Sequence, residues 1–139
     1  MSRRTRAREV AMQVLYQDDL NPSEHALDPD EFLQGRLTAD DLIQFSRSLI
    51  DGVRRNRAEL DELLSSTADN WTLRRMAAID RNIMRLGTFE IIYTSTPNRV
   101  AINEAVELAK RFGTRQSAQF VNGVLDRVLS EHDAAENDQ

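Results

Sequence analysis

The sequence predicts an all-α protein with about seven helices, an expectation that rests on three observations. The 139 residues include only five glycines and three prolines, so few positions interrupt regular backbone structure. Apolar residues recur at spacings of three and four through most of the chain, as they do in amphipathic helices. The sequence contains no run of alternating β-branched and polar residues that would indicate a strand.

Residues that favour helix ends bound the first two expected helices. Apolar residues on one face predict a first helix over residues 3–19, and Pro22 ends it. A short second helix over residues 29–36 begins with Pro29, because the fixed φ of proline suits the first helical position. Asp28 precedes it as a favourable cap.

Three helices are expected in the middle of the chain. A continuous apolar stripe predicts a long third helix over residues 39–66, which Gly52 and the polar run 54–57 are able to bend. A short fourth helix over residues 71–76 and a fifth over residues 79–95 follow.

The last two expected helices complete one domain. The sixth, over residues 100–112, is apolar around most of its circumference and is expected in the core, with Gly113 as a left-handed cap. The seventh begins near Ser117. The length suits a single domain, which we place at residues 1–131, followed by an acidic, disordered tail over residues 132–139.

Three residues with poor helix propensity lie inside these last two helices, namely Asn103, Asn122 and Gly123. Something other than local preference must therefore favour them. We expect close helix packing and buried hydrogen bonds to be the reason.

Charge is unevenly distributed along the chain. The formal net charge is -5, yet the first eight residues carry four positive charges and no acid. Between residues 18 and 41 the balance reverses, with many acids and a single arginine, Arg36. Such segregation is able to direct an anionic ligand to one end of a molecule. The cationic residues are Arg3, Arg4, Arg6 and Arg8.

Catalytic, metal-binding and cofactor-binding patterns are absent from the sequence. There is no cysteine, and His25 and His132 are not at metal-ligand spacing. No glycine-rich phosphate loop occurs. The sequence also lacks an apolar run of membrane-spanning length and a secretory signal. We therefore expect a cytoplasmic protein that is not an enzyme, holds no metal or cofactor and does not contact a membrane.

Two segments of the C-terminal half form a specific pattern, Val100-Ala-Ile-Asn-Glu-Ala-Val-Glu-Leu-Ala-Lys110 and Phe120-Val-Asn-Gly-Val-Leu-Asp126. Together they resemble the signature of the NusB family. Shorter matches extend the resemblance over nearly the whole chain: Arg6-Ala-Arg-Glu9, Leu15-Tyr16, Ile79-Asp80-Arg81 and Arg85-Leu-Gly-Thr-Phe-Glu90. Between residues 21 and 67 only the helical pattern supports it.

The resemblance implies a fold, a role and partners. The fold is two packed three-helix bundles without catalytic activity. The role is transcription antitermination within the RNA polymerase antitermination complex. The partners are the boxA element of nascent ribosomal RNA transcripts and NusE, a small-subunit ribosomal protein. The chain is expected to be a monomer or a homodimer.

The resemblance also implies site residues. The RNA surface would comprise the arginine-rich N-terminus and the beginning of the last helix, and Asp80 and Arg81 would face NusE. Thr5 interrupts what is often a continuous arginine run in the family, and Gln116 stands where some relatives carry an acid. The RNA-binding residues expected are Arg4, Arg6, Arg8, Tyr16, Gln116 and Phe120.

Each of these residues has a structural alternative. The arginines can be solvated charges at a frayed helix end. Phe120 at helical spacing is more often a core residue than a base-stacking platform, and Tyr16 can simply cover a helix edge. Asp80 can be an acid favoured by the helix dipole.

Two other functions remain open from the sequence. The first is a helical protein-interaction adaptor whose basic N-terminus binds an acidic partner instead of RNA. The second is the RNA-binding module of a ribosomal RNA methyltransferase, which the length of the chain disfavours because no methyl-donor domain follows.

Overall fold

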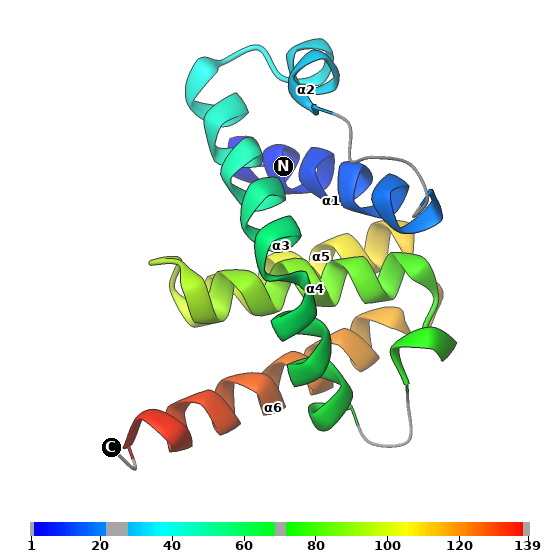
Figure 1. Cartoon of the computed structure of the whole chain (residues 1–139), viewed down its shortest axis with the longest axis vertical. Coiled ribbons are helices and arrows are strands. Elements are labelled where there is room, and N and C mark those ends of the chain that lie inside the picture. Colours follow the sequence, from blue (N-terminus) through cyan, green and yellow to red (C-terminus); the bar gives the residue numbers. More distant parts are fainter. Residues whose placement is uncertain (1, 22–27, 69–71, 138–139) are drawn as a thin grey trace. The chain divides into compact units, whose positions relative to one another are not determined.

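The computed structural model describes residues 2–21, 28–68 and 72–137, and this part of the chain forms six α-helices and one 3-10 turn (Figure 1). The all-α prediction is therefore confirmed. The predicted fourth helix is wrong in type, because the described part of it is a single 3-10 turn; its expected start at Trp71 lies outside the described residues. The elements are α1 (Arg3–Leu20), α2 (Asp30–Arg36), α3 (Asp40–Thr67), the turn η1 (Leu73–Arg75), α4 (Ala78–Tyr93), α5 (Asn98–Phe112) and α6 (Ser117–Asn137).

The chain divides into two compact units that are joined within α3. The N-terminal unit covers Met1–Arg55 and contains α1, α2 and the first part of α3. The C-terminal unit covers Asn56–Gln139 and contains the rest of α3, η1 and the last three helices.

In the N-terminal unit, side-chain caps and one buried hydrogen bond fix the first helices. The Ser2 hydroxyl accepts a hydrogen bond from the Thr5 backbone N–H and caps α1. Helix α2 begins at Asp30, one residue later than expected, and Pro29 rather than Asp28 is its N-cap; the Asp28 carboxylate still accepts a hydrogen bond from the Asp30 N–H at 3.0 Å. The apolar face predicted for α1 is mostly buried: Ala7, Val10, Ala11 and Leu15 are buried, Val14 is half-buried, and Met12 is buried beside them.

Helix α3 is continuous through the residues where a bend was possible. Gly52 is buried inside it, and the polar run 54–57 is helical throughout. The division between the two units falls in this run, after Arg55. The long third helix is thus confirmed, with ends within about one residue of those predicted.

In the C-terminal unit, α4 is the central element. Its residues 82–91 are all buried, and α4, α5 and α6 contact one another. A Cβ added at Gly87 would lie 2.8 Å from a methyl of Leu125 and 3.3 Å from the Cβ of Ala105. Glycine therefore lets α4 approach both neighbouring helices closely.

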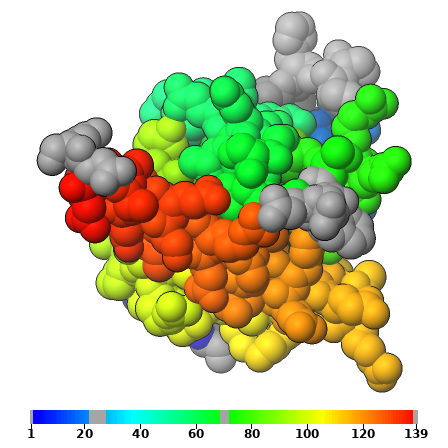
Figure 2. Space-filling view, turned by 90° about the horizontal axis from the view of Figure 1, so that it is seen from below, coloured from blue at the N-terminus to red at the C-terminus, as the bar shows by residue number. Residues whose placement is uncertain are grey.

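The close-packing explanation for Asn103, Asn122 and Gly123 is wrong. All three are exposed, and a Cβ at Gly123 would meet no atom within 4 Å. Figure 2 shows one side of α6 (orange to red) at the surface. Asn122 and Gly123 lie on α6 away from its buried stripe of Val121, Val124 and Leu125, and Asn103 lies on α5 outside the buried face of that helix, so all three reach solvent.

Gly113 is not a left-handed cap, because its φ is −93°. The glycine is required by space instead: a Cβ there would lie 2.4 Å from the Ser117 hydroxyl oxygen. At the other end of α6, residues 132–137 are helical where a disordered tail was expected, and Ala134 and Ala135 favour this extension. None of the described helices is long and apolar enough to cross a membrane.

Candidate nucleic-acid interface

The four arginines in the first turns of α1 are held in two different ways. Arg3 and Arg6 pair with carboxylates: Arg3 lies 3.4 Å from Asp41, and Arg6 lies 3.1 Å from Glu9. The other two contact an aromatic ring on α3. The guanidinium carbon of Arg4 lies 4.4 Å from the centre of the Phe45 ring, and that of Arg8 lies 5.1 Å from it.

Exposure separates the two arginines on the ring. Arg4 is exposed, and among the described residues it pairs with no acid. Arg8 is only 3% exposed. A guanidinium that is exposed and not neutralised is available to a phosphate, whereas a buried one first has to be uncovered. Arg4 is therefore the available member of the predicted set, while Arg6 is half-buried and pairs with Glu9, so it is only partly accessible.

Tyr16, two turns beyond Arg8 on α1, is half-buried. This environment suits a phenol that covers a helix edge and equally one that meets a ligand. The adjacent end of α1 is fixed by Asp18, whose carboxylate accepts two hydrogen bonds from the Arg54 guanidinium at 2.7 and 2.9 Å.

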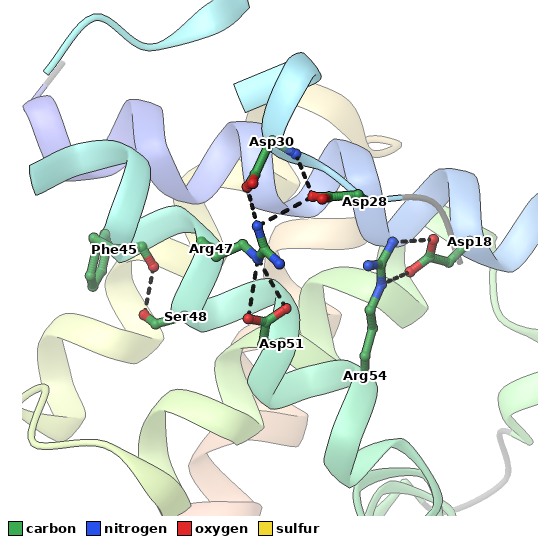
Figure 3. Close-up of polar contacts among 8 residues, drawn as sticks. All are labelled: Asp18, Asp28, Asp30, Phe45, Arg47, Ser48, Asp51 and Arg54. Atoms are coloured by element: carbon green, nitrogen blue, oxygen red, sulfur yellow. Dashed lines mark hydrogen bonds and ion pairs between the residues drawn. The ribbon is translucent and has the colours of Figure 1, made fainter. Parts of the chain in front are cut away.

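The acidic segment of the N-terminal unit is partly neutralised by the fold (Figure 3). Arg47 on α3 pairs with Asp28 at 3.3 Å, with Asp51 at 3.2 Å and with Asp30. The pKa of Arg47 is raised above its ordinary value, chiefly by the hydrogen bond with Asp30 and then by the charges of the three aspartates, against a lowering by desolvation. The acidic segment is therefore less negative in the folded protein than the sequence alone indicates.

Gln116 and Phe120 lie in the C-terminal unit, where α6 begins. Thr114 and Ser117 bond reciprocally there: the Thr114 N–H donates to the Ser117 hydroxyl at 2.8 Å, and the Ser117 N–H donates to the Thr114 carbonyl. This turn leaves Gln116 exposed and Phe120 half-buried. Phe120 is thus not fully buried in the core, and its ring is only partly exposed for stacking on a base.

Asp80 and Arg81 occupy the first turn of α4 in different environments. Arg81 donates to the backbone carbonyls of Leu73 at 2.7 Å and Met76 at 3.2 Å, and so ties η1 to α4. Asp80 is 9% exposed, and its Oδ1 has no hydrogen-bond partner among the described residues. A buried carboxylate oxygen without a donor is costly, so a donor that reached this atom would stabilise it.

The most informative contact of the site is the Phe45 ring beneath Arg4 and Arg8, and no sequence pattern indicates it. Phe45 belongs to the apolar stripe that predicts the third helix, a pattern typical of core residues, but it is half-buried. Among the described residues, no group of three or more histidines, aspartates and glutamates is placed to hold a metal ion.

Together these features define a small all-helical protein with a cationic helix end. The family model described as NusB family matches residues 5–130. The transcription antitermination protein NusB of Anaeromyxobacter dehalogenans is 43% identical over 93% of this chain and 92% of its own length. That of Myxococcus xanthus is 43% identical over 92% of this chain and 95% of its own length. The chain therefore belongs to the NusB family of transcription antitermination proteins, which confirms the predicted membership and agrees with the expectation that it is not an enzyme.

Solved structures give the same result. T. maritima NusB superposes with a TM-score of 0.81 at 35% identity, covering 94% of this chain and 92% of that one. A structure of the antitermination factors NusB and NusE in complex with double-stranded RNA also superposes with a TM-score of 0.81, at 26% identity, covering 94% of this chain and 98% of that one.

Proposed function

We propose that this chain binds the boxA element of nascent ribosomal RNA transcripts together with NusE, in the cytoplasm, as part of the RNA polymerase antitermination complex. The observation that carries the proposal is the exposed Arg4 guanidinium, which lies at a cationic helix end and pairs with no acid among the described residues. A solved relative that holds both NusE and RNA supports it.

Arg4 and Arg6 are the proposed phosphate ligands, because both are at least partly accessible and carry forked N–H donors; Arg6 would exchange its ion pair with Glu9 for the phosphate. Arg8 is 3% exposed, so it would contribute only after RNA binding uncovers its guanidinium. Gln116 is exposed and offers an amide to a base edge or phosphate, while the half-buried rings of Tyr16 and Phe120 offer faces to unpaired bases.

Asp80 is the proposed acceptor for NusE. Its Oδ1 has no hydrogen-bond partner among the described residues, and once a local movement uncovers this buried atom it would accept a hydrogen bond from an N–H or cationic side chain of the partner. Arg81 acts beside it by holding η1 in place.

Fluorescence anisotropy at near-physiological salt tests the RNA part. We expect labelled boxA RNA to bind in preference to a scrambled sequence, and NusE to strengthen that preference. Equal binding of both sequences with NusE present would contradict the proposal and leave a helical protein-interaction adaptor.

Asp80→Asn tests the NusE part. It should weaken NusE binding in calorimetry by about tenfold, since a charge-assisted hydrogen bond contributes about 1.5 kcal/mol or more. Asp133→Asn, at an exposed position on α6, removes the same charge and should leave the affinity unchanged. Equal affinities for both variants would show that Asp80 does not contact NusE.

A further inference from the structure

One aromatic ring in the N-terminal unit meets two of the arginines that the proposed function places in RNA binding. Arg4 and Arg8 are one turn apart on α1, and both guanidinium groups lie within cation–π distance of Phe45 on α3, at 4.4 and 5.1 Å from the ring centre. Residues four apart lie on the same face of a helix, and for this reason both arginine side chains reach the ring from one side of α1.

The ring holds an arginine differently from a carboxylate. A carboxylate accepts hydrogen bonds from the edge of the guanidinium plane and cancels its charge, as Asp41 does for Arg3 and Glu9 for Arg6. An aromatic face interacts with the flat face of the guanidinium and leaves the N–H groups at its edge able to donate. Arg4 is thus held in place while its charge and its donors stay available.

The ring itself is firmly mounted. The next residue, Ser46, is completely buried and donates a hydrogen bond from its hydroxyl to the Ala7 carbonyl at 2.9 Å, which fixes α3 against the first turns of α1. The Ser48 hydroxyl donates to the Phe45 carbonyl at 2.7 Å. Figure 3 shows Phe45 leaving α3 on a different side from Arg47, so the aspartates gathered around Arg47 lie away from the ring.

We infer that Phe45 is a positioning residue of the RNA site, which holds the Arg4 and Arg8 side chains in place without neutralising Arg4. This inference rests on the proposed function, because it assigns Phe45 a role in the same RNA interaction. The ligand class is single-stranded RNA, whose phosphates the ordered Arg4 guanidinium meets with less loss of side-chain entropy than a mobile arginine would incur.

The test compares RNA affinities of ring variants of the full-length chain. Phe45→Leu removes the aromatic face and should weaken boxA binding about two- to fivefold, whereas Phe45→Tyr keeps it and should bind as the parent does. A ring-fluorinated phenylalanine at position 45 keeps the size and packing but weakens the π face, so it should reproduce the loss even if Phe45→Leu fails to fold.

Phe32→Leu is the matched control. Phe32 carries Arg36 over its ring at 4.4 Å in the same unit, but neither residue is placed in RNA binding. This variant should leave boxA affinity unchanged. A merely structural role of Phe45 is separated by a double-mutant cycle: in an Arg4→Gln background, Phe45→Leu should cost much less affinity than in the parent.

An NMR measurement on the free protein tests whether the contact between Phe45 and Arg4 exists, independently of its effect on RNA affinity. The ring current of Phe45 should shift the Arg4 side-chain protons upfield, and Phe45→Leu should abolish that shift. If the shift disappears while boxA affinity stays at the parental value, the contact exists but the inference is overturned. If the parent itself shows no preference for boxA, the proposed function fails and this inference fails with it.

Discussion

Replacing Gly87 by alanine tests the packing of α4 against its neighbours in the C-terminal unit. The new Cβ would lie 2.8 Å from Leu125 Cδ1 and 3.3 Å from Ala105 Cβ. The Leu125 methyl can rotate, but this side chain is completely buried, and the Ala105 methyl has no rotamer to change. Overpacking of this kind costs about 1–3 kcal/mol, while alanine gains about 1 kcal/mol over glycine in helix propensity. The net expectation is a loss of about 1 kcal/mol.

Gly123→Ala supplies the control for helix propensity. A Cβ at Gly123 meets nothing within 4 Å, so this variant should gain about 0.5–1 kcal/mol. Urea unfolding followed by circular dichroism measures both free energies of unfolding. Gly87→Ala should be less stable than the parent and Gly123→Ala more stable, with about 2 kcal/mol between them. If Gly87→Ala were as stable as Gly123→Ala, the close approach at Gly87 would not constrain the fold and the reasoning would be refuted.

Three further predictions follow from single contacts. Arg4→Gln should reduce the slope of log affinity for boxA RNA against log salt by about 0.7, the value for one phosphate contact on a single strand, and should do so more than Arg3→Gln, because Arg3 already pairs with an acid. Anisotropy across a salt series measures both, and equal slopes would contradict the distinction. Asp61→Asn should cost about 2 kcal/mol in urea unfolding, since its carboxylate accepts hydrogen bonds at 2.6 and 3.0 Å from a buried guanidinium on α4; unchanged stability would be the opposing result. Glu59→Gln should lower the pKa of Tyr93, because the hydrogen bond to Glu59 is the main cause that raises it above 10.0; this contribution to stability is present below pH 10.0 and is lost as pH rises through the folded-state pKa. An absorbance titration of the phenolates measures the shift, and an unmoved pKa would exclude this cause.

Helix positions were largely predictable because their signals are local. The Asp28 side chain accepts a hydrogen bond from the Asp30 N–H at the start of α2, and Pro97 stands at the N-cap of α5; both signals can be read from neighbouring residues alone. Packing between helices was not predictable in the same way. Periodicity identifies a buried face but not the atoms that meet it, so Gly87 and Gly123 look alike in the sequence although only Gly87 approaches another helix.

The same distinction between local signals and contacts between helices applies to the candidate site. The sequence shows the arginines of α1, but their environments depend on α3, some 39 residues away at the Ala7–Ser46 contact. From the sequence, replacing Arg6 and Arg8 together by alanine should reduce RNA binding and leave thermal stability nearly unchanged. Because Arg8 is 3% exposed and lies over Phe45, we now expect that double variant to lose stability as well.

The most direct test of the RNA site is an NMR titration of the isotopically labelled chain with boxA RNA, in the presence of unlabelled NusE. The proposed function predicts that RNA-dependent shifts concentrate in the first turns of α1, around Arg4 and Arg6, and at the start of α6, around Gln116 and Phe120. Shifts confined to the acidic cluster around Arg47, or none at all beyond those caused by NusE, would contradict it.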